Sequence, residues 1–425
     1  MVELGVIAAV VVLYGLFSRR LQGTALTAPM VFVGAGLLLG WTGVVDFGFA
    51  ATETTFEFEI GNNVVLTFFE LTLVLLLFTD ATRLNLTVLR GNAGLPSRLL
   101  VIGLPLSIAL GGVLAGVFLL KLSFWEAAIV GAVLAPTDAA LGQAVVSNKR
   151  VPVRIRQALN VESGLNDGGS VPFLTLFIAL AALEANTGET GFWIRFAFEQ
   201  IGYGVALGVG VGLVGGLVID QATKRGWMLG IYQQLGIASL AVVAWASAEA
   251  VGGNGFIAAF VAGLAAGSAV RDLGEMVADF SEDEGKLLSL AVFFIFGAIA
   301  TETLGEVTWE MLVFAILSLT IIRMLPVAIS LAGTGLGART VAYMGWFGPR
   351  GLASIILAFV VLEEESVAGR GEIFVVMCIA VLLSVFLHGM TAGPLSAIYA
   401  NHIEASMAHD DPEMEDVAEL PTRGG

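Results

Sequence analysis

Long apolar segments alternate with short polar ones along almost the whole chain. Many of these segments reach the roughly 20 residues that cross a bilayer as a helix. The pattern predicts helices near residues 2–18, 28–45, 62–80, 98–120, 125–147, 156–183, 193–219, 229–249, 254–270, 287–301, 311–332, 340–362 and 371–397. The expected fold is therefore an all-α polytopic membrane protein with thirteen spans.

The division of the chain follows from the same pattern. Residues 1–400 are expected to form the transmembrane domain, and residues 401–425 an acidic tail. The polar stretch from Arg271 to Lys286 is expected to be a linker along the inner membrane surface. The first apolar run lacks a basic flank and a cleavage site, so we expect a first span rather than a removed signal.

Composition supports a membrane protein and excludes several other classes. The chain is 57% hydrophobic and 13% charged, whereas soluble domains carry about 25% charged residues. The net charge of −16 excludes a basic nucleic-acid surface. One cysteine, Cys378, permits no disulfide within the chain and no thiolate metal site.

The charges of alternate loops orient the spans. One set of loops carries most of the lysines and arginines, whereas the other set is rich in aspartate and glutamate. Because Lys and Arg prefer the cytoplasmic side, the first set is expected inside the cell. The N-terminus is then outside and the acidic tail is cytoplasmic, which requires an odd number of spans.

Two acids and an amide stand at the head of a span in the motif Glu162 to Gly168. A charged side chain at mid-bilayer costs about 2.5–3.5 kcal/mol, so such groups usually mark an ion path or a ligand site. Glu162 and Asn166 share one helix face, and Ser163 and Asp167 share the adjacent face. Oxygen ligands of this kind suit hard cations. The alternative is a solvated cap at the cytoplasmic end of the helix.

Proline interrupts another apolar run at Ala135-Pro136-Thr137-Asp138. Proline removes an amide donor and clashes with the preceding turn, so the helix is expected to break there. Broken backbone at membrane depth survives where it is buried in protein or lines a wet cavity. Its carbonyls can hold an ion, while Asp138 can balance the positive end of the following half-helix. The alternative is a simple proline kink with a capping aspartate.

A second interruption, Gly345 to Gly351, falls at the corresponding place in the second half of the chain. Paired broken segments in two halves point to an inverted-repeat transporter. The first repeat is expected at about residues 2–183 and the second at about 229–397. The alternative is a loop turn before the twelfth helix.

Two more ionisable groups lie within apolar runs. Arg323 has no polar neighbours in sequence, and a buried guanidinium needs a carboxylate partner, for which Glu162 or Asp138 would serve. The alternative is an arginine that extends along the lipid face to the membrane surface. Asp80 ends the third helix and would either join the ion path or meet interfacial water.

These features together resemble the NhaP-type sodium/proton antiporters of the monovalent cation/proton antiporter superfamily. The resemblance rests on the following residues: Thr137-Asp138, Glu162-Ser163, Asn166-Asp167, Arg323 and Phe347-Gly348-Pro349-Arg350-Gly351. It covers nearly the whole membrane region, including the number and orientation of the spans.

The resemblance implies an inverted-repeat fold with a dimer domain and a mobile core domain, a homodimer, and exchange of one cation for one proton. It makes Asp167 the carrier and places Na⁺ at Asp167, Ser163 and Thr137. Asp138 and Asn166 would hold the crossing half-helices and Asp167 in place. By the same resemblance, Glu162 would pair with Arg323, Arg350 would support the core, Asp80 is a candidate ion ligand, and Asn166 indicates electroneutral exchange.

The same resemblance implies a transporter of the cell membrane, not an enzyme, with no cofactor apart from the transported ion. No phosphate-binding motif of the G-x-x-x-x-G-K-[ST] type occurs, so an existing ion gradient would drive transport. A potassium/proton antiporter is the main alternative, and a cation channel is another. An intramembrane aspartyl protease using Asp138 and Asp167 is a further alternative, but no Gly-x-Gly-Asp element occurs.

Overall fold

A computed structural model describes residues 2–21, 24–51, 56–58, 63–83, 94–119, 121–138, 141–185, 190–270, 273–406, 411–415 and 417. The elements within these residues are α1 (Val2–Leu21), α2 (Ala28–Trp41), β1 (Phe49–Ala51), β2 (Phe56–Phe58), α3 (Asn63–Arg83), α5 (Gly94–Arg98), η1 (Leu99–Gly103), α6 (Leu104–Phe118), α7 (Phe124–Val133), α8 (Gln143–Val146), α9 (Val153–Ala185), α10 (Thr190–Lys224), α11 (Gly230–Glu249), α12 (Gly255–Ala269), α13 (Leu273–Thr303), η2 (Leu304–Glu306), α14 (Trp309–Leu319), α15 (Ile321–Ser330), α16 (Ala338–Trp346), α17 (Leu352–Glu363), α18 (Arg370–Ser406) and η3 (Pro412–Met414).

The expected all-α membrane fold is confirmed. Within the described ranges, nine helical segments are long and apolar enough to cross a membrane, and four shorter apolar helices join them. Taken in chain order, these correspond one to one with the thirteen expected spans. The described part of the chain adds one small antiparallel hairpin, in which β1 pairs with β2.

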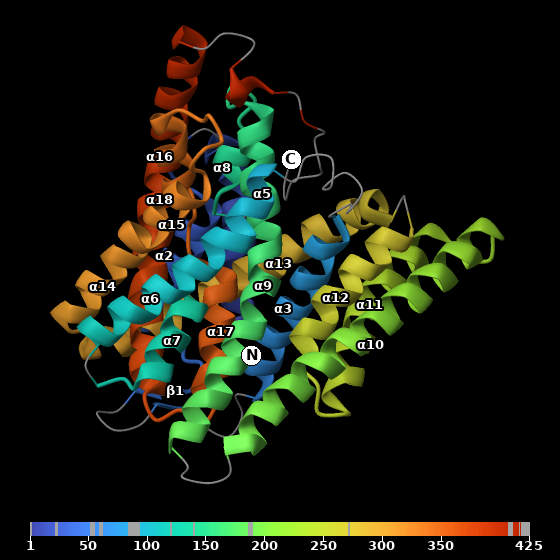
Figure 1. Cartoon of the computed structure of the whole chain (residues 1–425), viewed down its shortest axis with the longest axis horizontal. Coiled ribbons are helices and arrows are strands. Elements are labelled where there is room, and N and C mark those ends of the chain that lie inside the picture. The colour runs from blue at the N-terminus through green and yellow to red at the C-terminus, as the bar shows by residue number, and fades with distance from the viewer. Residues whose placement is uncertain are drawn as a thin grey trace.

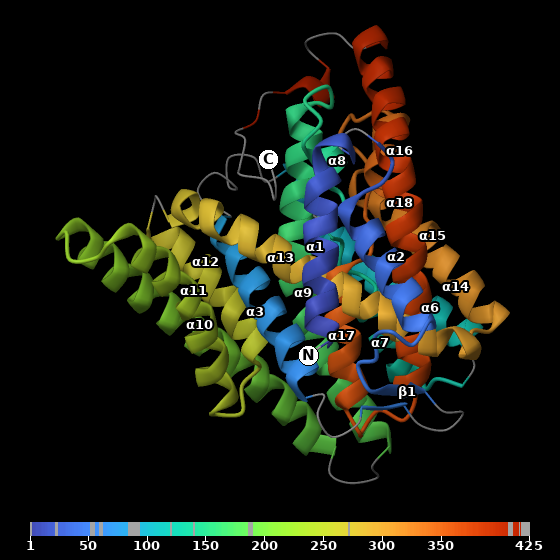
Figure 2. The same cartoon turned by 180° about the vertical axis from the view of Figure 1, so that it is seen from behind.

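The helices form two groups on either side of a central set. In both views α10, α11 and α12 pack together at one side, whereas α14, α15, α16 and α18 gather at the other (Figures 1 and 2). The long helix α9 runs through the centre and packs against α3, α7 and α10. α1 begins near the end of the molecule opposite to the one where α18 ends, as an odd number of spans requires.

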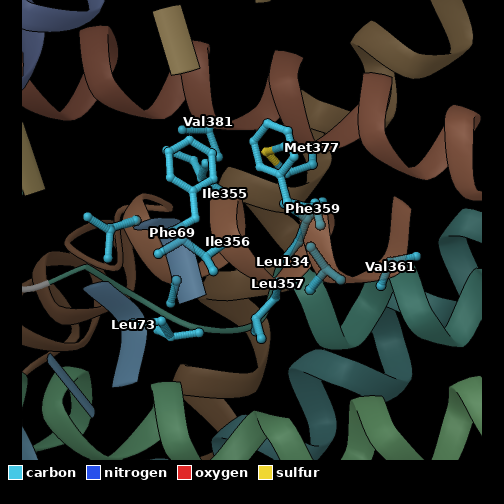
Figure 3. Close-up of a cluster of buried hydrophobic side chains, with 14 of the residues drawn as sticks. Phe69, Leu73, Leu134, Ile355, Ile356, Leu357, Phe359, Val361, Met377 and Val381 are labelled. Carbon is cyan, nitrogen blue, oxygen red and sulfur yellow. The ribbon is translucent and has the colours of Figure 1, made fainter. Parts of the chain in front are cut away.

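The centre of the molecule is a dense apolar core around α17. Phe359 of α17 makes edge-to-face contacts with Phe69 of α3 and Phe374 of α18, with ring centroids 4.8 and 4.7 Å apart (Figure 3). The side chains of α17 are buried almost without exception from its first residue, Leu352, to Leu362. A helix that is apolar all round belongs inside the protein, so α17 is covered by other helices rather than by lipid.

Both predicted interruptions are present. α7 ends at Val133, and the residues up to Asp138, including Pro136, are not helical. The second break separates α16 from α17 at residues 347–351. Two irregular segments therefore lie deep inside the helical bundle, where side chains must satisfy their backbone groups.

Two further distortions have different causes. The π-helical turn η1 lies directly before Pro105, which cannot donate a backbone hydrogen bond to the preceding turn. The break between α14 and α15 falls at Thr320, with φ −112° and ψ −93°, and no proline or glycine marks it in the sequence. The single helix expected over residues 311–332 is therefore two helices.

Two helices extend beyond their expected ranges. The stretch from Leu273 to Lys286, expected as a separate linker, is the first part of the continuous helix α13; residues 271–272 lie outside the described residues. α18 continues to Ser406, so it extends into the expected tail. Of the rest of that tail, the structure describes residues 411–415 and 417, and Glu413 is buried.

Candidate functional site

The two irregular segments meet and exchange hydrogen bonds. The Asp138 N–H donates to the Pro349 carbonyl at 2.8 Å. The Asp138 carboxylate accepts from the Leu352 N–H at 2.8 Å and from the Leu141 N–H at 3.4 Å. Since Leu352 opens α17, Asp138 caps a helix that belongs to the other broken segment. A negative side chain at this position complements the positive end of the helix dipole.

Arg350 makes the reciprocal connection from the second segment to the first. Its Nη1 donates to the carbonyls of Ala135 and Pro136 at 2.6 and 3.1 Å, and its Nη2 donates to the Ser318 carbonyl at 3.3 Å. The carbonyls of Ala135 and Pro136 follow the end of α7, and that of Ser318 lies in the last turn of α14, where carbonyls have no intrahelical donors. The side chain is fully buried, so its charge stabilises the negative ends of two helices.

Glu162 of α9 and Arg323 of α15 form a two-point ion pair. Nη1 of Arg323 lies 2.5 Å from Oε1 of Glu162, and Nη2 lies 2.8 Å from Oε2. The side chains are 4% and 3% exposed, so the pair is isolated from solvent. Gly348 lies against the arginine, and a Cβ at that position would overlap the guanidinium.

Two residues of α9 hold Thr137 of the first irregular segment. Asn166 accepts from the Thr137 N–H at 3.2 Å and donates to its hydroxyl at 2.7 Å. The Ser163 hydroxyl donates to the Thr137 carbonyl. The face of α9 that carries Ser163 therefore lies against the broken segment.

Asp167 is one helical turn after Ser163, on the same face of α9. It is 7% exposed, and its Oδ1 has no hydrogen-bond partner in the described part of the chain. A buried carboxylate without donors requires a proton or a cation. The arrangement can therefore hold either one, next to the oxygens of Ser163 and Thr137.

Asp80 is the predicted residue whose place in the site stays a prediction. It is buried near the end of α3, and α3 packs against α9. The other predicted residues come together around the crossing of the two irregular segments. Glu162 and Arg323 lie to one side of it, and Ser163, Asn166 and Asp167 approach it from α9.

The sequence did not predict two residues of α18 that contact this framework. The Ser384 hydroxyl accepts from the Arg350 N–H at 2.6 Å, and His388 lies within hydrogen-bond distance of Ser384. Both are fully buried. Their signal in the sequence is a polar pair four residues apart in an otherwise apolar run, which places both on one helix face.

Comparison with known proteins identifies the type of protein. The family model described as "Sodium/hydrogen exchanger, transmembrane" matches residues 6–397. The K(+)/H(+) antiporter NhaP2 of Shewanella oneidensis is 27% identical over 261 residues, covering 60% of this chain and 44% of that protein. The Na(+)/H(+) antiporter of Schizosaccharomyces pombe is 23% identical over 332 residues, covering 69% of this chain and 70% of that protein.

A solved structure shares the fold. The sodium proton antiporter MjNhaP1 from Methanocaldococcus jannaschii, in its structure at pH 8, superimposes with a TM-score of 0.74 at 19% identity. The match covers 94% of this chain and 98% of that one. By contrast, this chain spans only about half the length of the Shewanella relatives.

Proposed function

This chain belongs to the transmembrane sodium/hydrogen exchanger family, and on that premise we propose that it exchanges a monovalent cation for a proton. Na⁺ is the proposed cation, with Li⁺ as a second substrate. Asp167 is the carrier, occupied in turn by a proton and by the cation. The cation is held by Asp167 together with Ser163 and the backbone of Thr137.

One observation carries this proposal. Of the three carboxylates around the crossing, Glu162 is neutralised by Arg323 and Asp138 accepts from backbone N–H groups. Asp167 alone among them has a buried oxygen without a donor in the described residues. A proton and a cation compete for that oxygen, so loading one releases the other.

Movement of the crossing region then exposes the site to the opposite side of the membrane. Because one acid exchanges one proton for one monovalent cation, each cycle moves no net charge. Asn166, which cannot ionise, adds no second exchangeable proton. The exchange is therefore electroneutral, and its rate in sealed vesicles should not change with an imposed membrane potential.

The direct test is the variant Asp167→Asn in proteoliposomes with an imposed pH gradient. It should abolish cation-dependent dissipation of the gradient, because an amide cannot take up and release a proton at neutral pH, so cation binding is no longer coupled to proton release. The matched control is Asp220→Asn on α10, a carboxylate that forms an ion pair with Lys224 one helical turn away; exchange should continue at the wild-type rate. Exchange by Asp167→Asn at that same rate would refute the carrier assignment.

A potassium/proton antiporter is the second candidate, because the Shewanella relatives are named as such. The same assay, repeated with Na⁺, Li⁺ and K⁺ over a series of pH values, distinguishes the two. Dissipation of the gradient without any added cation would instead indicate a channel.

We propose further that the protein is a homodimer in the cell membrane, with its N-terminus outside and its tail in the cytoplasm. The outer helices α10 and α11 are the proposed dimer interface, because only 22% of the residues in the apolar stretch of each helix are buried within one copy. Analytical ultracentrifugation in detergent should give about twice the chain mass of 44.3 kDa.

A further inference from the structure

We infer that His388 of α18, acting through Ser384, is a positioning residue for the cation site. This inference rests on the proposed function. His388 is 1% exposed and Ser384 is fully buried. Neither side chain was assigned a role above, yet together they reach both ends of the second irregular segment.

The histidine holds the beginning of that segment. Its Nε2 lies 3.0 Å from the carbonyl of Trp346, the last residue of α16. A carbonyl can only accept, so this contact is a hydrogen bond when Nε2 carries a hydrogen. The rings of His388 and Trp346 lie against each other with centroids 5.0 Å apart.

Ser384 holds the far end. Its oxygen accepts from the Arg350 N–H at 2.6 Å, and it lies 3.2 Å from Nδ1 of His388. Nδ1 also lies 3.0 Å from the Ser384 carbonyl, so each ring nitrogen faces a carbonyl and Nδ1 lies beside the serine hydroxyl as well. The Arg350 N–H, the Ser384 hydroxyl, the imidazole and the Trp346 carbonyl are thus linked by successive hydrogen-bond contacts.

The hydrogen bonds of Ser384 and His388 hold the five residues 347–351 from the side of α18. The same segment supplies the Pro349 carbonyl that receives the Asp138 N–H and the Arg350 guanidinium that holds the carbonyls of Ala135 and Pro136. Those two residues directly precede Thr137. Loosening the segment should therefore displace the Thr137 backbone, and with it a proposed ligand of the cation.

The prediction is a change in apparent cation affinity. Substituting His388→Leu removes both hydrogen bonds of the ring and should raise the KM for the transported cation about five- to thirtyfold, as expected for losing one to two hydrogen bonds. The maximal rate should change much less. A residue that only fills space would lower stability without this selective effect on KM.

Three further variants separate the two bonds. His388→Gln keeps a donor near the Trp346 carbonyl, and His388→Asn keeps an acceptor near the Ser384 hydroxyl; each should give a smaller increase in KM than leucine. Thr391→Val is the control, because Thr391 accepts from the indole of the same Trp346 without contacting the irregular segment. It should leave KM unchanged.

The measurement is initial exchange rate against cation concentration in proteoliposomes. If wild-type protein catalyses no exchange, the proposed function fails. If wild type exchanges cations but folded His388→Leu has the wild-type KM, the inference about His388 fails alone. Should the leucine variant not fold, Ser384→Ala, which loses a single oxygen, decides by the same comparison of KM with wild type.

Discussion

The buried charges at the crossing are stabilised in three different ways. Glu162 and Arg323 neutralise each other, whereas Arg350 is held by carbonyls at helix ends. Asp138 accepts from backbone N–H groups of both broken segments. Asp167 has a buried oxygen without a partner in the described residues. The first three arrangements build the framework, and the fourth leaves a position for a proton or a cation.

The ion pair should behave as a unit in stability. Glu162→Gln and Arg323→Ala should each lower the free energy of unfolding by about 3–5 kcal/mol, because each leaves an uncompensated buried group. The double variant should lose much less than the sum of the two, since the pair is destroyed only once. Thermal or denaturant unfolding of the purified protein in detergent provides the measurement.

Additive losses in that cycle would contradict the pairing. A control cycle is available at Arg195 and Glu199, which form an exposed pair on one helix. Pairs of that kind contribute little, so neither single variant should alter stability by an amount comparable with the buried pair.

Gly351 allows a contact that no larger residue permits. A Cβ at this position would overlap the Asp138 carboxylate. Substituting Gly351→Ala should therefore displace Asp138 from the start of α17, cost about 1–3 kcal/mol of stability through overpacking, and strongly reduce exchange. Gly393→Ala on α18 is the control, because nothing lies within 4 Å of a Cβ there. Equal exchange rates for the two variants would show that the close approach is unimportant.

At the scale of whole helices, side chains of other elements hold helix ends in place by hydrogen-bonding their terminal carbonyls. Arginine side chains donate hydrogen bonds to carbonyls at the ends of several helices. Arg98 donates to the carbonyls of Ser330 and Ala332 at the end of α15, and Arg156 donates to that of Val146 at the end of α8. Such charges near helix C-termini also complement the helix dipole.

The sequence predicted the elements better than their mutual contacts. The lengths of the apolar runs were sufficient to predict the spans, and Pro136 indicated the first break because proline cannot continue a helix. The break at Thr320 was missed, since no local residue signals it and the Ser318 carbonyl accepts a hydrogen bond from Arg350 of the second irregular segment. Asp138 was expected to cap its own half-helix, yet it also caps α17. Tertiary partners of this kind leave no periodic pattern.

For the molecule as a whole, the described part of the tail connects helices that are distant in sequence. Glu413 is 2% exposed and accepts from the Gly337 N–H at 2.7 Å and the Thr340 hydroxyl at 3.0 Å. Gly337 precedes α16, so the glutamate caps that helix. Arg154, near the start of α9, lies 3.0 Å from Glu415 and also donates to the Pro412 carbonyl. The tail thereby joins the starts of α9 and α16.

Removing that cap should release the tail. Glu413→Ala leaves the Gly337 N–H without its acceptor and should lower the free energy of unfolding by about 1–3 kcal/mol. Hydrogen–deuterium exchange at residues 337–341 should become faster. Glu413→Gln, which keeps an acceptor oxygen, is the matched control and should have the smaller effect. Unchanged exchange in the alanine variant would mean that the tail does not stabilise α16.

The hydrogen bonds that Asp138 and Arg350 make between the two irregular segments also constrain the order in which the protein can fold during synthesis. Asp138 and Leu352, which are joined by one of these hydrogen bonds, are 214 residues apart in the sequence. Arg350 and Ala135 are 215 residues apart. While the ribosome is still synthesising the intervening spans, the end of α7 has not yet met the guanidinium that will hold it. Until Arg350 and Leu352 have been synthesised, the Asp138 carboxylate and the carbonyls that follow α7 therefore lack their final hydrogen-bond partners. A truncated product that stops before Arg350 would present an unfinished crossing, a feature by which membrane quality control could recognise it.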